Sequence, residues 1–348
     1  MRLQTPKVTA GTPERRQPGF GTRVFGPVDA VTLGPPHARS QASAHRLLLW
    51  YVIASVPALG AGLLGREEFA PALASCLLLL AVSLTAAVFW EGLFARWRRR
   101  DFDPAWYVAP WLFVLLLPLS TPLWLAAVAM SFGAIFGHHI FGGTGRSLVS
   151  PALLGLLFVH FSYPELAQHS DLLGGVDAGD WWSAALLPTA SENGLTPALG
   201  PAAASPLACL IGGLCLVRVG AASPRTLLGV LGGVIVVATL FNLLVNLQGE
   251  APAQALPWYW HLVAGELAVG VVFIATDPGT GALTRIGRWA HGFLVGALTV
   301  LIRVLDPTHP DGTLFAILLA GLAVPLIDYL VVRGHLHRRS RWGAYRGD

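Results

Sequence analysis

The chain has 348 residues, of which 54% are hydrophobic and only 12% are charged, and its mean hydropathy is +0.60. Water-soluble globular proteins carry far more charge than this. The net charge of +4 does not indicate a nucleic-acid partner, because the basic residues fall in short clusters between apolar runs. Composition therefore predicts a protein that lies in lipid.

Ten apolar segments, separated by polar breaks, predict an all-α polytopic membrane protein with about ten transmembrane helices. They comprise residues 47–64, 70–94, 108–119, 122–140, 148–163, 206–217, 227–247, 258–275, 287–305 and 313–332. The segments near 108 and 206 are shorter than a full crossing, and each adjoins proline. Such segments are typical of broken or tilted helices buried in a bundle.

Arginine is concentrated in alternate connections, which predicts the topology because basic loops favour the cytoplasmic side. The predicted inner connections are residues 96–100, 142–146, 218–225, 276–288 and 335–346, and each contains arginine. The predicted outer loop, residues 164–205, contains no Lys or Arg. We therefore expect a bacterial-type inner-membrane protein with both termini cytoplasmic. Residues 1–46 form its arm, 47–332 its membrane domain and 333–348 its basic tail.

A glycine-rich turn at Gly142, Gly143, Thr144 and Gly145 lets backbone amides approach a phosphate or a flat ring closely. The alternative is a tight turn between two packed helices. A weakly similar turn occurs at residues 277–281, and five plus five helices would suit an inverted repeat. Ser150 and Pro151 begin the following helix, whose N-terminus is a plausible anion or cofactor-edge site.

Ionisable side chains lie within or beside apolar segments, where they are costly and mark functional sites by default. They are Glu91, Glu266, Arg303 and Asp328. Arg303 could instead pair with a carboxylate such as Glu266 or Asp306. Asp277 ends an apolar segment, where it either binds a cation or proton or only caps the next turn.

Two other features predict no metal site. His138 and His139 are adjacent, so on an α-helix they point about 100° apart and rarely share an ion; a solvated or headgroup position is favoured. Cys76, Cys209 and Cys215 lie in apolar runs without metal-ligand spacing. No phosphate-binding loop or dinucleotide motif occurs, so a redox cofactor would lie on or between the helices.

Several short blocks go beyond hydrophobicity: VFWEGLF (88–94), FGGTGR (141–146), SPAL (150–153), FSYP (161–164), WYWHL (258–262), ATDP (275–278), LIRV (301–304) and PLID (325–328). In order and spacing they resemble the family of the B subunit of the sodium-translocating NADH:quinone oxidoreductase and, more distantly, the D subunit of the Rnf complex. The resemblance extends from about Phe25 to the C-terminus.

The resemblance implies an electron-transfer subunit that carries FMN on a threonine in an outer loop, in some members also riboflavin, with ion pumping coupled to electron flow toward quinone. The family's attachment pattern, Asp-x-x-Ser-Gly-Ala-Thr, is matched best by residues 193–197 (NGLTP), which places FMN on Thr196. Ala190 stands where the pattern has aspartate. In a rival register from Asp180, Leu186 replaces the threonine and excludes a phosphoester.

The inner site also departs from the family, because Ser147 and Ser150 replace two asparagines and His138-His139 replaces a Lys-Glu pair. Serine offers one hydroxyl where asparagine presents a paired donor and acceptor. We expect Gly142, Gly143, Thr144, Ser147 and Ser150 to line a flavin or quinone-facing pocket. Asp277, Asp328 and Glu266 are the expected ion path for Na+ or H+.

The sequence thus predicts a membrane subunit of a redox complex that relays electrons through flavin. Expected partners are other membrane and soluble subunits, quinone, membrane lipid and a flavin transferase. The alternative is a redox-inactive transporter or membrane-anchoring subunit that kept the scaffold and lost the covalent flavin.

Overall fold

The computed structural model describes residues 44–66, 68–103, 106–143, 147–167, 200–202, 205–248, 257–263, 265–305 and 312–344. Within these ranges the regular secondary structure is entirely helical. Residues 1–43 of the predicted N-terminal arm lie outside these ranges, and residues 44–46 belong to the first helix.

The first group of helices comprises α2 (Ala44–Leu64), α3 (Phe69–Trp97), α4 (Val108–Leu116), α5 (Leu123–Gly133), the π-helix η1 (Ala134–His139), α6 (Pro151–Ser162) and α7 (Pro164–Ala167). The second comprises α9 (Pro206–Val219), α10 (Pro224–Gln248), α11 (Trp258–Val263), α12 (Leu267–Val269), the π-helix η2 (Gly270–Ala275), α13 (Arg285–Leu305) and α14 (Gly312–Ala344). Each of the predicted apolar segments is helical over most of its described length.

Five helices of the described chain are long and apolar enough to cross a membrane: Arg46–Leu64, Phe69–Trp97, Pro224–Val245, Arg285–Leu305 and Gly312–Arg338. The segments predicted to be short are short, since α4 has 9 residues and α9 has 14. Both are below the roughly 20 residues of a complete crossing.

Two boundaries differ from the prediction. The segment 258–275 is broken rather than continuous, because α11 ends at Val263 and Gly265 takes a positive φ of 67° before α12 begins. Glycine adopts that conformation more readily than residues with a Cβ. In addition, α14 continues through the basic residues that follow Val332 as far as Ala344.

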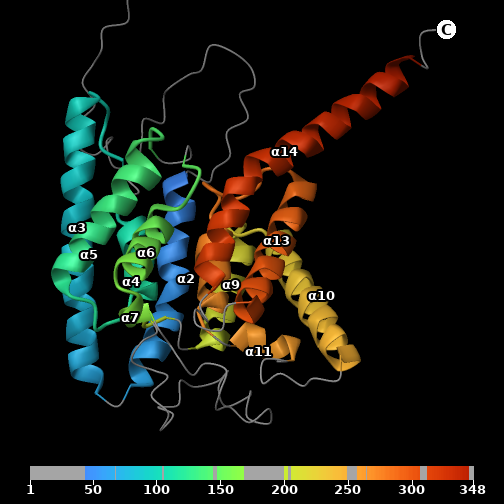
Figure 1. Cartoon of the computed structure of the whole chain (residues 1–348). Helices are drawn as coiled ribbons and strands as arrows, with labels where there is room; N and C mark the ends of the chain where they lie inside the picture. Colours follow the sequence, from blue (N-terminus) through green and yellow to red (C-terminus); the bar gives the residue numbers. More distant parts are fainter. Residues whose placement is uncertain are drawn as a thin grey trace, which may run out of the picture. The chain divides into compact units, whose positions relative to one another are not determined.

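The helices pack side by side, with α3 against α5, α5 against α6, α2 against α9, and α13 between α10 and α14 (Figure 1). The closest packing is between α10 and α13. Gly229 and Gly233 of α10 face Gly292 and Gly296 of α13, and we call these four residues the glycine seam. A Cβ on any of them would overlap backbone of the opposite helix, so the two backbones are in direct contact as in membrane GxxxG pairs.

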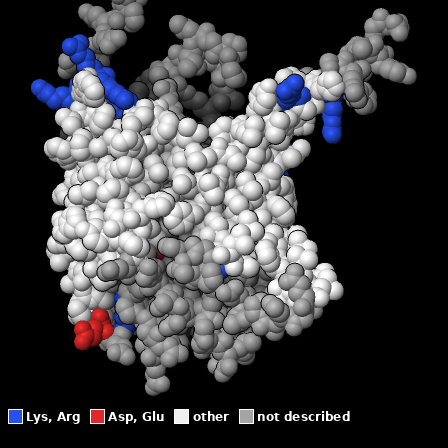
Figure 2. All heavy atoms as spheres, viewed as in Figure 1, with Lys and Arg blue, Asp and Glu red and all other residues white. Residues whose placement is uncertain are grey.

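The described residues on the visible face are free of charged side chains over most of the helix lengths (Figure 2). Large hydrophobic side chains such as Phe89, Leu243 and Leu326 are exposed, which suits contact with lipid tails. Arginines gather at the C-terminal end of α3 and along the end of α14, and these ends lie on the same side (Figures 1 and 2).

Candidate functional site

A cavity of about 220 Å³ lies between α2, α3, α4, η1, the start of α6 and the turn that follows η2. Its walls are mostly apolar, with Leu112, Met130 and Trp106 among the lining side chains. It also contains Ser147, Ser150 and Asp277, so the structure brings together three of the residues expected to bind a cofactor or ion. A few polar groups in an apolar pocket are typical of small-molecule sites.

The glycine-rich turn follows η1, and its described residues, Gly142 and Gly143, are not among the residues that line the cavity, contrary to expectation. Gly142 and Gly143 have φ of 107° and 110°, a region that side chains with a Cβ rarely adopt. A Cβ on Gly143 would also lie 2.5 Å from Nη1 of Arg100. Both glycines are therefore needed by the turn, and Gly143 also leaves room for that guanidinium. Thr144 lies outside the described residues.

Ser150 is the N-cap residue of α6, and Pro151 occupies the first helical position as expected. The Ser150 side chain makes no capping hydrogen bond. Instead, Ser150 is buried and lines both the main cavity and a smaller one. Its hydroxyl is placed where it can contact an occupant rather than its own helix.

Asp277 caps a turn and also lines the cavity, and its binding of a cation or proton stays a prediction. Its Oδ1 accepts a hydrogen bond of 2.9 Å from the Gly279 amide. The turn is fixed to α2 because the Tyr51 hydroxyl donates to the Thr276 carbonyl at 2.7 Å. Burial raises the pKa of the Asp277 carboxyl, and the Gly279 amide opposes that rise only in part.

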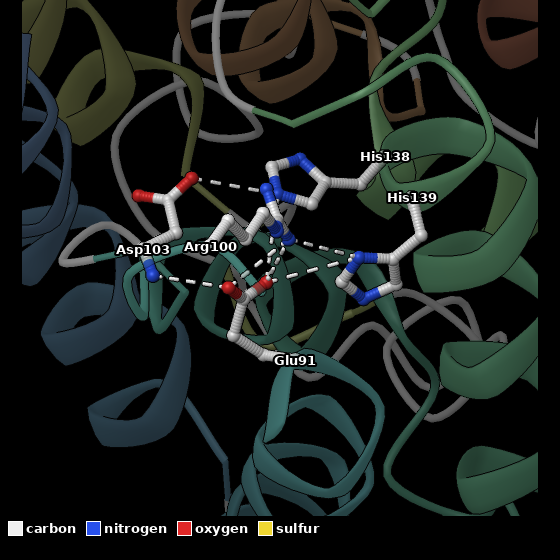
Figure 3. A network of polar contacts seen from close by, with 5 residues as sticks. All are labelled: Glu91, Arg100, Asp103, His138 and His139. Carbon is white, nitrogen blue, oxygen red and sulfur yellow. Dashed lines mark hydrogen bonds and ion pairs between the residues drawn. The ribbon is translucent and has the colours of Figure 1, made fainter. Parts of the chain in front are cut away.

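A polar network lies at one wall of the cavity, which Glu91, His138 and His139 line, and its members point toward one another (Figure 3). Nη2 of Arg100 donates to both carboxylate oxygens of Glu91, at 2.9 and 3.1 Å. The same Nη2 lies 3.4 Å from Nδ1 of His139. The Asp103 amide donates to Glu91 at 3.0 Å, and Nε2 of His138 lies 3.5 Å from the Asp103 carboxylate.

The expected solvated position of the histidine pair is wrong. The side chain of His139 is 2% exposed and that of His138 is 17% exposed, and both face Glu91 (Figure 3). They lie in η1, whose π-helical winding departs from the α-helical geometry on which the expectation rested. The His139 ring stacks on Phe94, with centroids 4.5 Å apart.

Glu266 and Arg303 form a separate buried region at the break between α11 and α12. Glu266 is 1% exposed and Arg303 is 2% exposed. Arg303 donates to the His261 carbonyl at 2.7 Å and to the Thr313 hydroxyl at 3.2 Å. The guanidinium thus satisfies a carbonyl that the interrupted helix leaves without a helical partner. Glu266 is not among the residues that line the main cavity.

Asp328 has the geometry of a helix cap. From α14 it accepts hydrogen bonds from the amides of Leu283 and Thr284 at 2.8 and 3.1 Å, and another from the Thr284 hydroxyl. These groups precede the first turn of α13, where negative charge is favoured. Asp328 holds two helices together at this point, and its place in an ion path stays a prediction.

His291 was missed by sequence reasoning. It is 2% exposed, and neither ring nitrogen has a hydrogen-bond partner. With Ser150 and Thr280 it lines the smaller cavity, of about 10 Å³, roughly the space of one water. Arg100 and Asp103 were missed as site residues because they occur in a charged run that served only as a topology signal.

Comparison with known proteins places the chain in a family. Residues 31–336 match the NQR2, RnfD, RnfE family. The chain belongs to this family.

Similar proteins within the NQR2, RnfD, RnfE family are B subunits of the Na(+)-translocating NADH-quinone reductase. The protein of Azotobacter vinelandii is 40% identical over 280 residues, which covers 74% of this chain and 67% of the relative. That of Stutzerimonas stutzeri is 37% identical over 287 residues, covering 78% and 71%. With five helices of membrane length, this family membership makes the chain a multi-pass membrane protein.

The outer-loop residue expected to carry FMN, Thr196, lies outside the described residues. All three cysteines are free: Cys76 lies on α3, and Cys209 and Cys215 lie on α9.

Proposed function

We propose that this chain is the B-type membrane subunit of an Nqr-like redox complex, which passes electrons through a flavin toward quinone and couples this flow to movement of Na+ or H+. The observation that carries the proposal is the cavity in which Ser147, Ser150 and Asp277 meet. The names of its relatives support the same role, since each is a subunit of a Na+-translocating NADH-quinone reductase.

The cavity suits part of a flavin rather than a whole one. Its 220 Å³ is below the roughly 300–1,000 Å³ of typical ligand pockets, so we propose that the flat ring enters and the remainder stays outside. Ser147 and Ser150 would hydrogen-bond the ring edge through their hydroxyls, and Leu112 and Met130 would keep water from the ring. A bound flavin supplies the capacity to accept and release electrons.

Asp277 is the proposed ion-coupling residue of this cavity. Its raised pKa favours holding a proton near neutral pH more than an exposed aspartate does. In the same place the carboxylate offers an oxygen ligand, which hard cations prefer. Glu266 and Asp328 remain proposed members of the path, with the helix-break and helix-cap contacts described above.

We further propose ten membrane crossings with both termini on the cytoplasmic side of a bacterial inner membrane. The arginine-bearing ends of α3 and α14 lie on the same side (Figures 1 and 2), as this topology requires. The two similar glycine-rich turns do not support a five-plus-five inverted repeat. They follow the fourth and eighth apolar segments, and Ser147 and Gly279 of the two turn regions line one cavity.

The test is flavin content of the full chain, co-expressed with its complex partners and a flavin transferase and purified in mild detergent. The denatured wild-type band is examined for in-gel flavin fluorescence. Fluorescence that disappears in Thr196→Ala, and is retained in the exposed control Thr85→Ala, establishes covalent FMN at Thr196. Acid treatment releases non-covalently bound flavin. A smaller amount of released flavin in Ser150→Leu than in wild type establishes the cavity as a non-covalent flavin site.

A dark denatured band together with no released flavin would contradict the electron-relay role. The redox-inactive transporter or membrane-anchoring subunit would then be favoured, in line with the serines that replace asparagine at 147 and 150.

A further inference from the structure

The polar network contains a set of metal ligands that the proposed electron relay does not use. Glu91 comes from the C-terminal part of α3, and His138 and His139 end η1. One carboxylate oxygen and one nitrogen from each ring all lie within 4.8 Å of one another. Oε2 of Glu91 is 3.9 Å from Nε2 of His138 and 3.7 Å from Nδ1 of His139.

We propose that Glu91, His138 and His139 bind a divalent first-row transition metal such as Zn2+ or Fe2+, and that the ion displaces the Arg100 guanidinium. Two imidazoles and a carboxylate are a ligand set for these metals. Ligand atoms around a tetrahedral zinc at about 2.0–2.2 Å are about 3.4 Å apart. The two separations from Glu91 Oε2 in the structure, 3.9 and 3.7 Å, approach that value.

The Arg100 guanidinium marks the place of a cation. Its Nη2 is 2.9 Å from Glu91 Oε2 and 3.4 Å from His139 Nδ1, so positive charge already lies between two of the three ligands. A hydrogen bond from Arg100 requires Nδ1 of His139 to present its lone pair, which is the state that binds metal. The buried Nε2 of His138 has no hydrogen-bond partner. This nitrogen is therefore available to bind a metal ion next to the Arg100 guanidinium.

Arg100 is positioned so that its guanidinium can move out of the proposed metal site. Its side chain is 24% exposed, and its Nε has no hydrogen-bond partner. It follows Arg99, which has a positive φ of 51°, a strained conformation for a residue with a Cβ. Release of the guanidinium removes the competing cation.

The surroundings orient the ligands, as the residues around the ligands do in other metal sites. The Phe94 ring stacks on His139, and the Asp103 amide holds Glu91 at 3.0 Å. The carboxylate of Asp103, 3.5 Å from Nε2 of His138, is near enough to join the coordination. The two imidazoles also make this site unsuited to alkali cations such as Na+, because hard cations prefer oxygen ligands.

The experiment is titration of Co2+ and Zn2+ into the purified full chain, carried on a tag without histidine. We expect one ion per chain and visible Co2+ absorption. The double variant His138→Gln/His139→Gln removes two ligands and weakens binding by at least about 100-fold, the upper end for loss of a residue that only supports a ligand. Arg100→Gln tightens binding, because the competing charge is gone. The control His335→Gln/His337→Gln on exposed α14 leaves binding unchanged.

X-ray absorption at the zinc edge of the wild-type chain tests the ligands without any variant. Two imidazole nitrogens and carboxylate oxygen at about 2.0–2.2 Å are expected. A shell of oxygen alone, binding retained in the histidine double variant, or weaker binding in Arg100→Gln would each overturn the proposal. Absence of binding by the wild-type chain would overturn it as well.

Discussion

The cavity wall around Glu91 and the glycine seam between α10 and α13 hold helices together in opposite ways. At the wall, a carboxylate, a guanidinium and two imidazoles connect α3 with η1. At the seam, four glycines let two backbones touch with no side chain between them. The wall therefore keeps polar groups inside an apolar bundle, where each needs a partner. The seam has no side chains between the two helices, and van der Waals contact between their backbones stabilises it.

This difference separates the part of the molecule that can change its chemistry from the part that cannot. The wall tolerates exchange of one charged group for another, such as arginine for a metal ion. The seam tolerates no added atom, because a Cβ overlaps backbone rather than a flexible side chain.

The largest expected effect comes from removal of the wall's carboxylate. Glu91→Ala leaves Arg100 and the Asp103 amide without their shared acceptor. Breaking a fully buried ion pair costs about 3–5 kcal/mol, and we expect the lower end, about 3 kcal/mol, because Arg100 is partly exposed. Denaturant unfolding in mild detergent measures the loss.

The matched control is Glu68→Ala, an exposed carboxylate just before the same helix, which is expected to change stability by less than about 0.5 kcal/mol. Equal effects at Glu91 and Glu68 would show that the network does not stabilise the wall.

The next largest effect is expected at the seam. Gly233→Ala places a Cβ into the Phe293 carbonyl, and overpacking of this kind costs about 1–3 kcal/mol. Gly232→Ala, one residue earlier on the same helix, meets nothing within 4 Å and is expected to gain up to about 1 kcal/mol from helix propensity. Thermal unfolding of the two variants under identical conditions checks the opposite signs.

The smallest effect is a pH dependence at Asp277. Burial raises the pKa of the Asp277 carboxyl in the folded chain. The free energy of unfolding is therefore highest at a pH below the ordinary aspartate pKa, where the acid is protonated in both states. It decreases as pH rises through the folded pKa, because burying the ionised carboxylate is unfavourable. Asp277→Asn cannot ionise and keeps the hydrogen bond from Gly279. The variant is expected to match wild type near about pH 4 and to unfold at a higher temperature near about pH 8.

This measurement needs a bulky organic cation as the only counter-ion. Addition of Na+ should then stabilise wild type and not Asp277→Asn, since only the carboxylate binds it. A constant difference between the two proteins at all pH values would contradict the raised pKa.

Much of the fold follows from the sequence, because apolar runs and prolines determine where helices begin and end. The positions of the helical segments and the short lengths of α4 and α9 were predicted correctly. The break at Gly265 was not predicted, since a single glycine within an apolar run does not by itself indicate a positive φ. The seam pattern, Gly229 with Gly233 and Gly292 with Gly296, is visible in the sequence but does not identify which helices pair.

The site was less predictable, because it depends on contacts between distant segments. Ser147, Ser150 and Asp277 were expected to be functional and share a cavity, although nothing in their spacing shows that they meet. The Arg100–Glu91 ion pair joins the end of α3 to its own following turn, and the run of arginines conceals which one turns inward. The histidine pair was misplaced because the π-helical winding of η1 is not readable from its residues.

The contact between Arg303 and the His261 carbonyl has a consequence for biosynthesis. The donor and acceptor are 42 positions apart, and the donor is made later because it belongs to α13. During synthesis the His261 carbonyl therefore has no hydrogen bond from Arg303 until α13 has been made. The interrupted helix is therefore completed late, by a side chain arriving from downstream, and its insertion is tied to that of the helix that follows it.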